Sequence, residues 1–206
     1  VSVQMDRPSF TLNPTSCAKK QIGARAISTL GAVASLSNPF QVGSCRNLGF
    51  SPQLKMSLKG PTKRAGHPAF KAVLTQKPGQ ANISKLSIAL PPTEFLDQAH
   101  VSNPCTRPQF AAGKCPPSSV LGKVRAFTPL LDKPLEGPLY FRSNGGEREL
   151  PDVVADLNGQ VHLISVGFVD AIHKKGSEQS RIRTTIATVP DAPVSKVVIE
   201  LNAGKK

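Results

Sequence analysis

Apolar and polar residues alternate along several short runs of this chain, most clearly between positions 53 and 59. Leu54, Met56 and Leu58 fall on one side of an extended backbone, and Lys55 and Lys59 fall on the other. Successive side chains of a β-strand point to opposite faces. The run therefore predicts a half-buried strand with a basic outer face.

Comparable runs recur at short intervals, separated by turn residues. The chain has 19 Pro and 16 Gly, which favour short strands over long helices. Asn158 and Gly159 lie between two apolar runs and are the strongest hairpin signal, and a longer hairpin loop is expected at 174–177. The predicted strands cover residues 1–5, 22–30, 33–36, 54–58, 70–74, 86–90, 120–127, 139–142, 153–157, 161–171, 182–188 and 197–201.

One segment, residues 93–100, favours a short helix, because Thr93 can cap it and Phe95, Leu96 and Ala99 form an apolar stripe. The predicted fold class is all-β, with Ig-like β-sandwich modules, disulfide-stapled loops and at most one short helix. We expect a small N-terminal β unit over 1–50. A larger sandwich over 51–206 would form from two halves, 51–114 and 115–206.

The four cysteines fall into two pairs that are close in sequence, Cys17 with Cys45 and Cys105 with Cys115. They form no C-x-x-C motif, and no His lies at zinc-ligand spacing from them. Of the three possible connectivities we favour these local disulfides, and with them an oxidising compartment. The alternative is four buried free thiols in a cytosolic protein.

The formal net charge is +13, which suggests an anionic partner such as an anionic polysaccharide. The alternative is that dispersed Lys and Arg simply keep a secreted protein soluble. Nucleic acid is disfavoured as a partner, because few aromatic residues are interleaved with the basic ones. The candidate anion-binding residues are Lys55, Lys59, Lys123, Arg125, Arg181 and Arg183.

No catalytic, cofactor-binding or metal-ligating motif is found. Asp152 and Asp156 would share one face of a strand and could bind a cation or act as paired acids. Surface salt bridges are the simpler interpretation, and a turn-capping role is the simplest account of Asp191. A hydrolase is disfavoured, and no apolar run is long enough to span a bilayer.

Several motifs together resemble a recurrent module of large, uncharacterised secreted or surface proteins of actinobacteria. The resemblance implies a secreted or cell-surface location and no known activity, and the chain, which begins at Val1, is expected to be a mature or excised piece. The motifs that carry it are Asp6-Arg7-Pro8, Phe10 to Thr15 with Cys17, Cys115-Pro116, Thr128 to Leu131, Pro134-Leu135, Gly137 to Tyr140, Leu150 to Asp152, Arg183 to Thr185 and Val189 to Lys196.

Two functional hypotheses follow. The first is a structural or adhesive β module of a secreted, cell-surface or filament-forming protein, whose partners are other copies of itself or adjacent modules. It would assemble by strand exchange, through the apolar residues of two terminal strands, Val1, Val3 and Met5 or Val197, Ile199 and Leu201. The alternative is a binding module for anionic envelope polymers.

Overall fold

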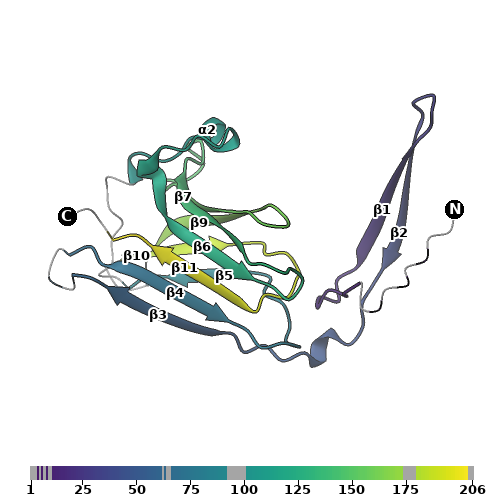
Figure 1. Cartoon of the computed structure of the whole chain (residues 1–206), viewed down its shortest axis with the longest axis horizontal. Helices are drawn as coiled ribbons and strands as arrows, with labels where there is room; N and C mark the ends of the chain where they lie inside the picture. The colour runs from purple at the N-terminus through teal and green to yellow at the C-terminus, as the bar shows by residue number, and fades with distance from the viewer. Residues whose placement is uncertain are drawn as a thin grey trace.

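The described part of the chain folds mainly into β-strands (Figure 1). The computed structural model describes residues 11–61, 66–91, 101–173 and 180–203, together with positions 4, 6, 8 and 63. The helix predicted over 93–100 and the strand predicted over 1–5 lie outside these residues, apart from the isolated position 4. The all-β prediction is confirmed for the described part of the chain.

The strands form two separate sheets. One is a hairpin of β1 (Lys20–Ile27) and β2 (Val33–Phe40). The other is a nine-stranded antiparallel sheet in the order β3-β4-β11-β6-β7-β8-β9-β10-β5. Its strands are β3 (Gln53–Lys59), β4 (Ala69–Thr75), β5 (Leu86–Ala89), β6 (Val120–Phe127), β7 (Leu135–Arg142), β8 (Asp152–Leu157), β9 (Leu163–His173), β10 (Ser180–Ile186) and β11 (Lys196–Leu201).

The strand order joins segments that are distant in sequence. β4 pairs with β11, and β5 pairs with β10. Both segments predicted as halves, 51–114 and 115–206, therefore contribute strands to one sheet. The hairpin predicted at Asn158 and Gly159 is present, because β8 and β9 pair antiparallel with Leu157 opposite Leu163.

The strand register gives the nine-stranded sheet one apolar face. Residues directly opposite each other on neighbouring strands share a face, so one row across β3, β4, β11 and β6 contains Met56, Ala72, Ile199 and Val124. The core lies on this face and contains Val124, Leu135, Leu139, Ala155 and Leu157. Alternation of apolar residues along each strand thus produces a continuous hydrophobic layer.

A loop layer covers the other face of the sheet at β7 to β9. It includes α2 (Arg107–Ala111), which lies inside the loop closed by the Cys105–Cys115 disulfide. The Phe110 ring of α2 meets the Tyr140 ring of β7 edge-on, with 5.9 Å between centroids. Cys105 also pairs with the backbone at the end of β7, so the disulfide ties α2 to the sheet.

Sequence analysis missed α2, although its start carries a recognisable signal. The Thr106 hydroxyl accepts a hydrogen bond from the Gln109 amide, and the Gln109 side chain accepts one from the Thr106 amide. This capping box, with Pro108 in the first turn, is typical of a helix N-terminus. The spacing was readable, but the nearby cysteines and glycine favoured a loop.

β7 begins at Leu135, four residues before the start predicted for this strand at Leu139. Two residues of this strand, Gly137 and Pro138, are unusual inside a β-strand. A side chain at Gly137 would collide with the carbonyl oxygen of Asp156 on β8, and Pro138 has no amide proton to pair. The Asn158 side chain donates to the Asp156 carbonyl instead, at 3.3 Å. Close backbone approach therefore explains Gly137 inside a central strand.

We expect Gly137→Ala to lower the free energy of unfolding by about 1–3 kcal/mol, because the added methyl group must displace the neighbouring strand. Urea denaturation with intact disulfides measures the change. Gly49→Ala is the matched control, since no atom lies within 4 Å of its added methyl group. It should change stability by less than about 0.5 kcal/mol, and equal losses in both variants would contradict the explanation.

Candidate functional site

The most unusual part of the structure is the β1–β2 hairpin, which we call the arm (residues 20–40). It stands apart from the nine-stranded sheet (Figure 1). Among the described residues, β1 pairs only with β2, so both outer edges of the arm lack strand partners. A lone two-stranded hairpin is only marginally stable in water, so the arm is suited to gain a partner.

The two faces of the arm differ in polarity. The register places Ala24 opposite Leu36 and Ala26 opposite Ala34. The other face is polar, with Arg25 opposite Ser35 and Gly23 opposite Ser37, except for Ile27 and Val33 beside the turn. The apolar face consists of Ile22, Ala24, Ala26, Ala34, Leu36 and Phe40, together with the polar Lys20 and Asn38 near the base of the arm.

This apolar face is open to solvent. Ile22 is 60% exposed and Leu36 is 61% exposed, and Leu30 at the tip is 95% exposed. Large aliphatic side chains gain roughly 1.5–3 kcal/mol each when they leave water completely. Two such side chains, Ile22 and Leu36, are exposed on one face of an unsupported hairpin, which indicates an interaction surface.

The base of the arm is fixed at two levels. The Cys17–Cys45 disulfide closes it, with 5.7 Å between the Cα atoms. Immediately before Cys17 in the chain, the backbone amides of Thr15 and Ser16 donate hydrogen bonds to the Asp191 carboxylate, at 3.0 Å and 3.1 Å. It also accepts one from the Asn82 side chain, at 2.9 Å. Asp191 thus connects the arm to the loops of the nine-stranded sheet.

These contacts correct the predicted role of Asp191, which anchors a segment 176 residues away rather than only capping its own turn. Partial burial disfavours its charged form. The hydrogen bonds from Asn82, Thr15 and Ser16 outweigh this effect and hold the pKa of Asp191 below its ordinary value of 3.8. No signal in the sequence near Asp191 identifies such distant partners.

The nine-stranded sheet is left open between its two edge strands. Among the described residues, β3 pairs only with β4 and β5 only with β10. Both edge strands nevertheless line one hollow of about 210 Å³, so the sheet curls until its edges approach. We call this hollow the seam; its lining residues are Met56, Ser57, Leu58, Phe70, Ala89, Leu90 and Pro91.

The seam is apolar and incompletely covered. Met56 is 58% exposed and Leu58 is 49% exposed, although both lie on the face of the sheet that carries the core. Leu54, on the same face of β3, is also exposed. The predicted alternation in β3 is therefore present, but its apolar side is not buried in this chain.

Of the two predicted strand-exchange segments, the C-terminal one lies in the interior of the sheet. Val197, Ile199 and Leu201 belong to β11, which pairs with β4 on one side and β6 on the other. Both edges of β11 are occupied because its antiparallel neighbours supply the full ladder, so the expectation that it reaches another copy is wrong. Val1, Val3 and Met5 lie outside the described residues.

The predicted anion-binding residues share the outer face of the sheet. The register connects Lys55 through Val73 and Val198 to Arg125. The same alternation continues across β7 to β9 and reaches Arg183 opposite Asp170. This outer basic face contains the predicted Lys55, Lys59, Lys123, Arg125, Arg181 and Arg183, and also Lys71 and Lys196.

Acidic residues neutralise part of this face. Glu200 on β11 lies 2.8 Å from Lys71, 3.7 Å from Lys123 and 3.6 Å from Arg125, and the hydrogen bond from Lys71 lowers the pKa of Glu200. Arg183 pairs with Asp170 in the same way and lowers the pKa of that carboxyl.

Lys55 and Lys59 differ from these paired cations, since neither has an acidic partner in the part of the chain that the structure describes. β3 is therefore the strand whose outer positive charge is least compensated.

The two aspartates predicted as a possible acid pair or cation site, Asp152 and Asp156, each contact basic side chains. Asp152 is 1% exposed and pairs with Arg148 at 2.7 Å and Arg142 at 3.6 Å, so it is a buried ion pair rather than the predicted surface one. Asp156 lies on the same face of β8 as Asp152 and contacts His162 at 2.6 Å. The described residues contain no group of three or more metal-ligating side chains.

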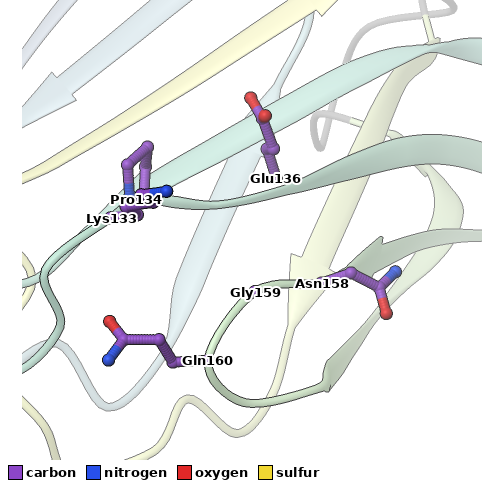
Figure 2. Close-up of a pocket in the computed structure, with 6 residues that line it drawn as sticks. All are labelled: Lys133, Pro134, Glu136, Asn158, Gly159 and Gln160. Atoms are coloured by element: carbon purple, nitrogen blue, oxygen red, sulfur yellow. The ribbon is translucent and has the colours of Figure 1, made fainter.

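A hollow of about 440 Å³ lies between the start of β7 and the β8–β9 loop. Figure 2 shows Lys133, Pro134 and Glu136 on one side and Asn158, Gly159 and Gln160 on the other. The side chains of Glu136 and Asn158 point away from each other (Figure 2). These lining residues include no Ser, Thr, Cys or His.

Comparisons with known proteins gave no match to a family model, a curated protein or a solved structure. Within the described ranges, no helix is long and apolar enough to cross a membrane. The arm, the seam and the outer basic face are therefore the candidate functional surfaces.

We expect Asp191→Asn to weaken the attachment of the arm by roughly 1–3 kcal/mol, because the carboxylate loses its charge and part of its acceptor capacity. Hydrogen exchange of the Thr15 and Ser16 amides at neutral pH measures this loss. Asp132→Asn, at an exposed loop carboxylate that pairs with Gln160, is the control. Unchanged protection in Asp191→Asn would contradict the anchoring role.

The same anchor predicts a pH dependence. The folded-state pKa of Asp191 is lowered, so its contribution to stability is fully present above the unfolded value of 3.8 and is lost as the pH falls through the folded pKa. The Thr15 and Ser16 amide resonances should therefore titrate with a midpoint below pH 3.8. This transition should be absent from Asp191→Asn.

Proposed function

We propose that this chain is a structural or adhesive β module of a secreted, cell-surface or filament-forming protein, and that copies of it associate through the arm. We interpret the curled sheet as the two layers of an Ig-like sandwich. The resemblance to the recurrent module of actinobacterial surface proteins agrees with this proposal. The two disulfides support an oxidising location, where such bonds persist.

The observation that carries the proposal is the free, two-faced arm. Its outer strand edges offer unpaired backbone groups, and its apolar face offers side chains to bury. A strand edge of this kind adds readily to the sheet of another chain. The disulfide and Asp191 hold the arm outward at its base, which reduces the entropy lost on association.

Leu36→Lys should prevent self-association, because it places a charge in the centre of the apolar face. We expect the dissociation constant between copies to rise by at least about 10-fold, as burial of one leucine is lost. Sedimentation velocity over a concentration series measures it. Ser37→Lys adds the same charge on the polar face and should associate like the unmodified protein.

Salt should strengthen this association. Copies with a formal charge of +13 repel one another, and the Debye length shortens from about 30 Å at 0.01 M to about 10 Å at 0.1 M salt. Apolar contact is not screened in this way. A protein that stays monomeric at every salt and protein concentration would contradict the proposed function.

The outer basic face favours a second candidate function, the binding of anionic envelope polymers. Lys55 and Lys59 place two charges that have no acidic partner among the described residues on a single strand, β3. Because such binding is electrostatic, salt should weaken it, in contrast to association through the arm. The two functions can therefore be separated by the sign of their salt dependence.

We expect the double variant Lys55→Ala, Lys59→Ala to bind an anionic polysaccharide several-fold more weakly at low salt, since each exposed charge contributes a modest electrostatic term. Isothermal titration at two salt concentrations measures this. The control is Lys19→Ala with Lys114→Ala, which removes two charges outside the sheet strands. Equal affinities for the two double variants would contradict the binding face.

A further inference from the structure

We infer that the seam between β3 and β5 is the acceptor for the arm of a second copy of this chain. This inference rests on the proposed function and adds the surface that the arm contacts. In this contact, the apolar face of one arm, centred on Ala24 and Leu36, packs against the seam of the other copy, centred on Met56 and Leu58.

The seam has the properties that an acceptor requires. Met56 and Leu58 face the interior of the curled sheet but stay about half exposed, because β3 is an edge strand that, among the described residues, pairs only with β4. Phe70 from β4 and Leu90 beyond β5 complete an apolar lining. The unpaired backbone edges of β3 and β5 run along both sides of it.

The arm supplies what the seam lacks. Its apolar face presents Ile22, Ala24, Ala26 and Leu36, with small residues between the larger ones and the polar Lys20 and Asn38 toward its base. Small side chains let one sheet surface approach another closely, and the larger Ile22 and Leu36 can then contact the seam. Each strand of the arm also has a free edge that can align with β3 or β5.

The occupant is a second copy because the arm does not reach the seam of its own chain. Its base is fixed by Cys17–Cys45 and by Asp191, and the arm points away from the sheet (Figure 1). Every copy nevertheless contains one free arm and one open seam. A chain that exposes two complementary apolar surfaces of this kind provides its own partner.

Donor and acceptor are different surfaces, so the contact is heterologous. Such a contact repeats from one copy to the next, and it builds a closed ring or an open filament according to whether the rotation closes. Direct pairing of one arm with another arm would instead be isologous and would stop at a dimer. This difference makes the inference testable apart from the proposed function.

The experiment uses one donor variant, Leu36→Lys, and one acceptor variant, Met56→Lys, in the full chain. Met56 is exposed, so a lysine is compatible with folding, and circular dichroism checks this. Gln53→Lys adds the same charge to the outer face of β3 and is the acceptor control. Each variant is analysed alone, and the two are then mixed in equal amounts, by sedimentation velocity.

For each variant alone, the dissociation constant for self-association should rise by at least about 10-fold. Gln53→Lys should keep the dissociation constant of the unmodified chain. The mixture should form a heterodimer, because the intact arm of Met56→Lys docks on the intact seam of Leu36→Lys. The heterodimer should not grow further, since its remaining arm and seam are both defective.

Other results would overturn the inference. If Met56→Lys associates normally while Leu36→Lys does not, the arm has another acceptor and the proposed function stands without the seam. If both variants are monomeric and their mixture stays monomeric, arm and seam do not meet. If the unmodified chain does not associate, the inference and the proposed function fail together.

Discussion

The apolar face of the nine-stranded sheet must be kept away from water, and most features of this protein follow from that constraint. The sheet curls so that Val124, Leu139 and Leu157 share one core. The curl ends before the edge strands pair, so Met56 and Leu58 of β3 stay half exposed. The apolar face of the arm is exposed to water in the same way, because β1 and β2 form a separate sheet among the described residues. Two incompletely buried surfaces in one chain are the physical basis of the proposed assembly.

Polar contacts decide where these surfaces are held. Asp191 connects Thr15 and Ser16 to the loops of the main sheet, and the Cys17–Cys45 disulfide closes the base of the arm immediately above. At the other side of the molecule, the Cys105–Cys115 disulfide and the buried Asp152 ion pairs attach α2 and the 143–151 loop. Cross-links and paired charges thus fix the segments that have little hydrophobic burial of their own.

Much of the fold could be predicted from local pattern. The alternation in residues 53–59, the hairpin at Asn158 and Gly159 and both disulfide pairs are present, because period-two alternation, turn chemistry and short cysteine spacing act locally. The start of β7 was missed because Gly137 and Pro138 normally signal a turn, and only the carbonyl of Asp156 explains Gly137. The free edge was also misplaced: β11 is apolar like an exchanging strand, but its neighbours come from distant segments.

The pattern of residues was enough to predict short amphipathic strands and a large positive charge, and it favoured local pairing of the cysteines. It also determined which residues share a face, since alternation survives any strand order. Only the tertiary structure decided which strands lie at the edges, that the arm stands free and that Asp191 anchors it. These features depend on contacts between residues far apart in the chain, such as Asp191 and Thr15, and no local pattern encodes such a pairing.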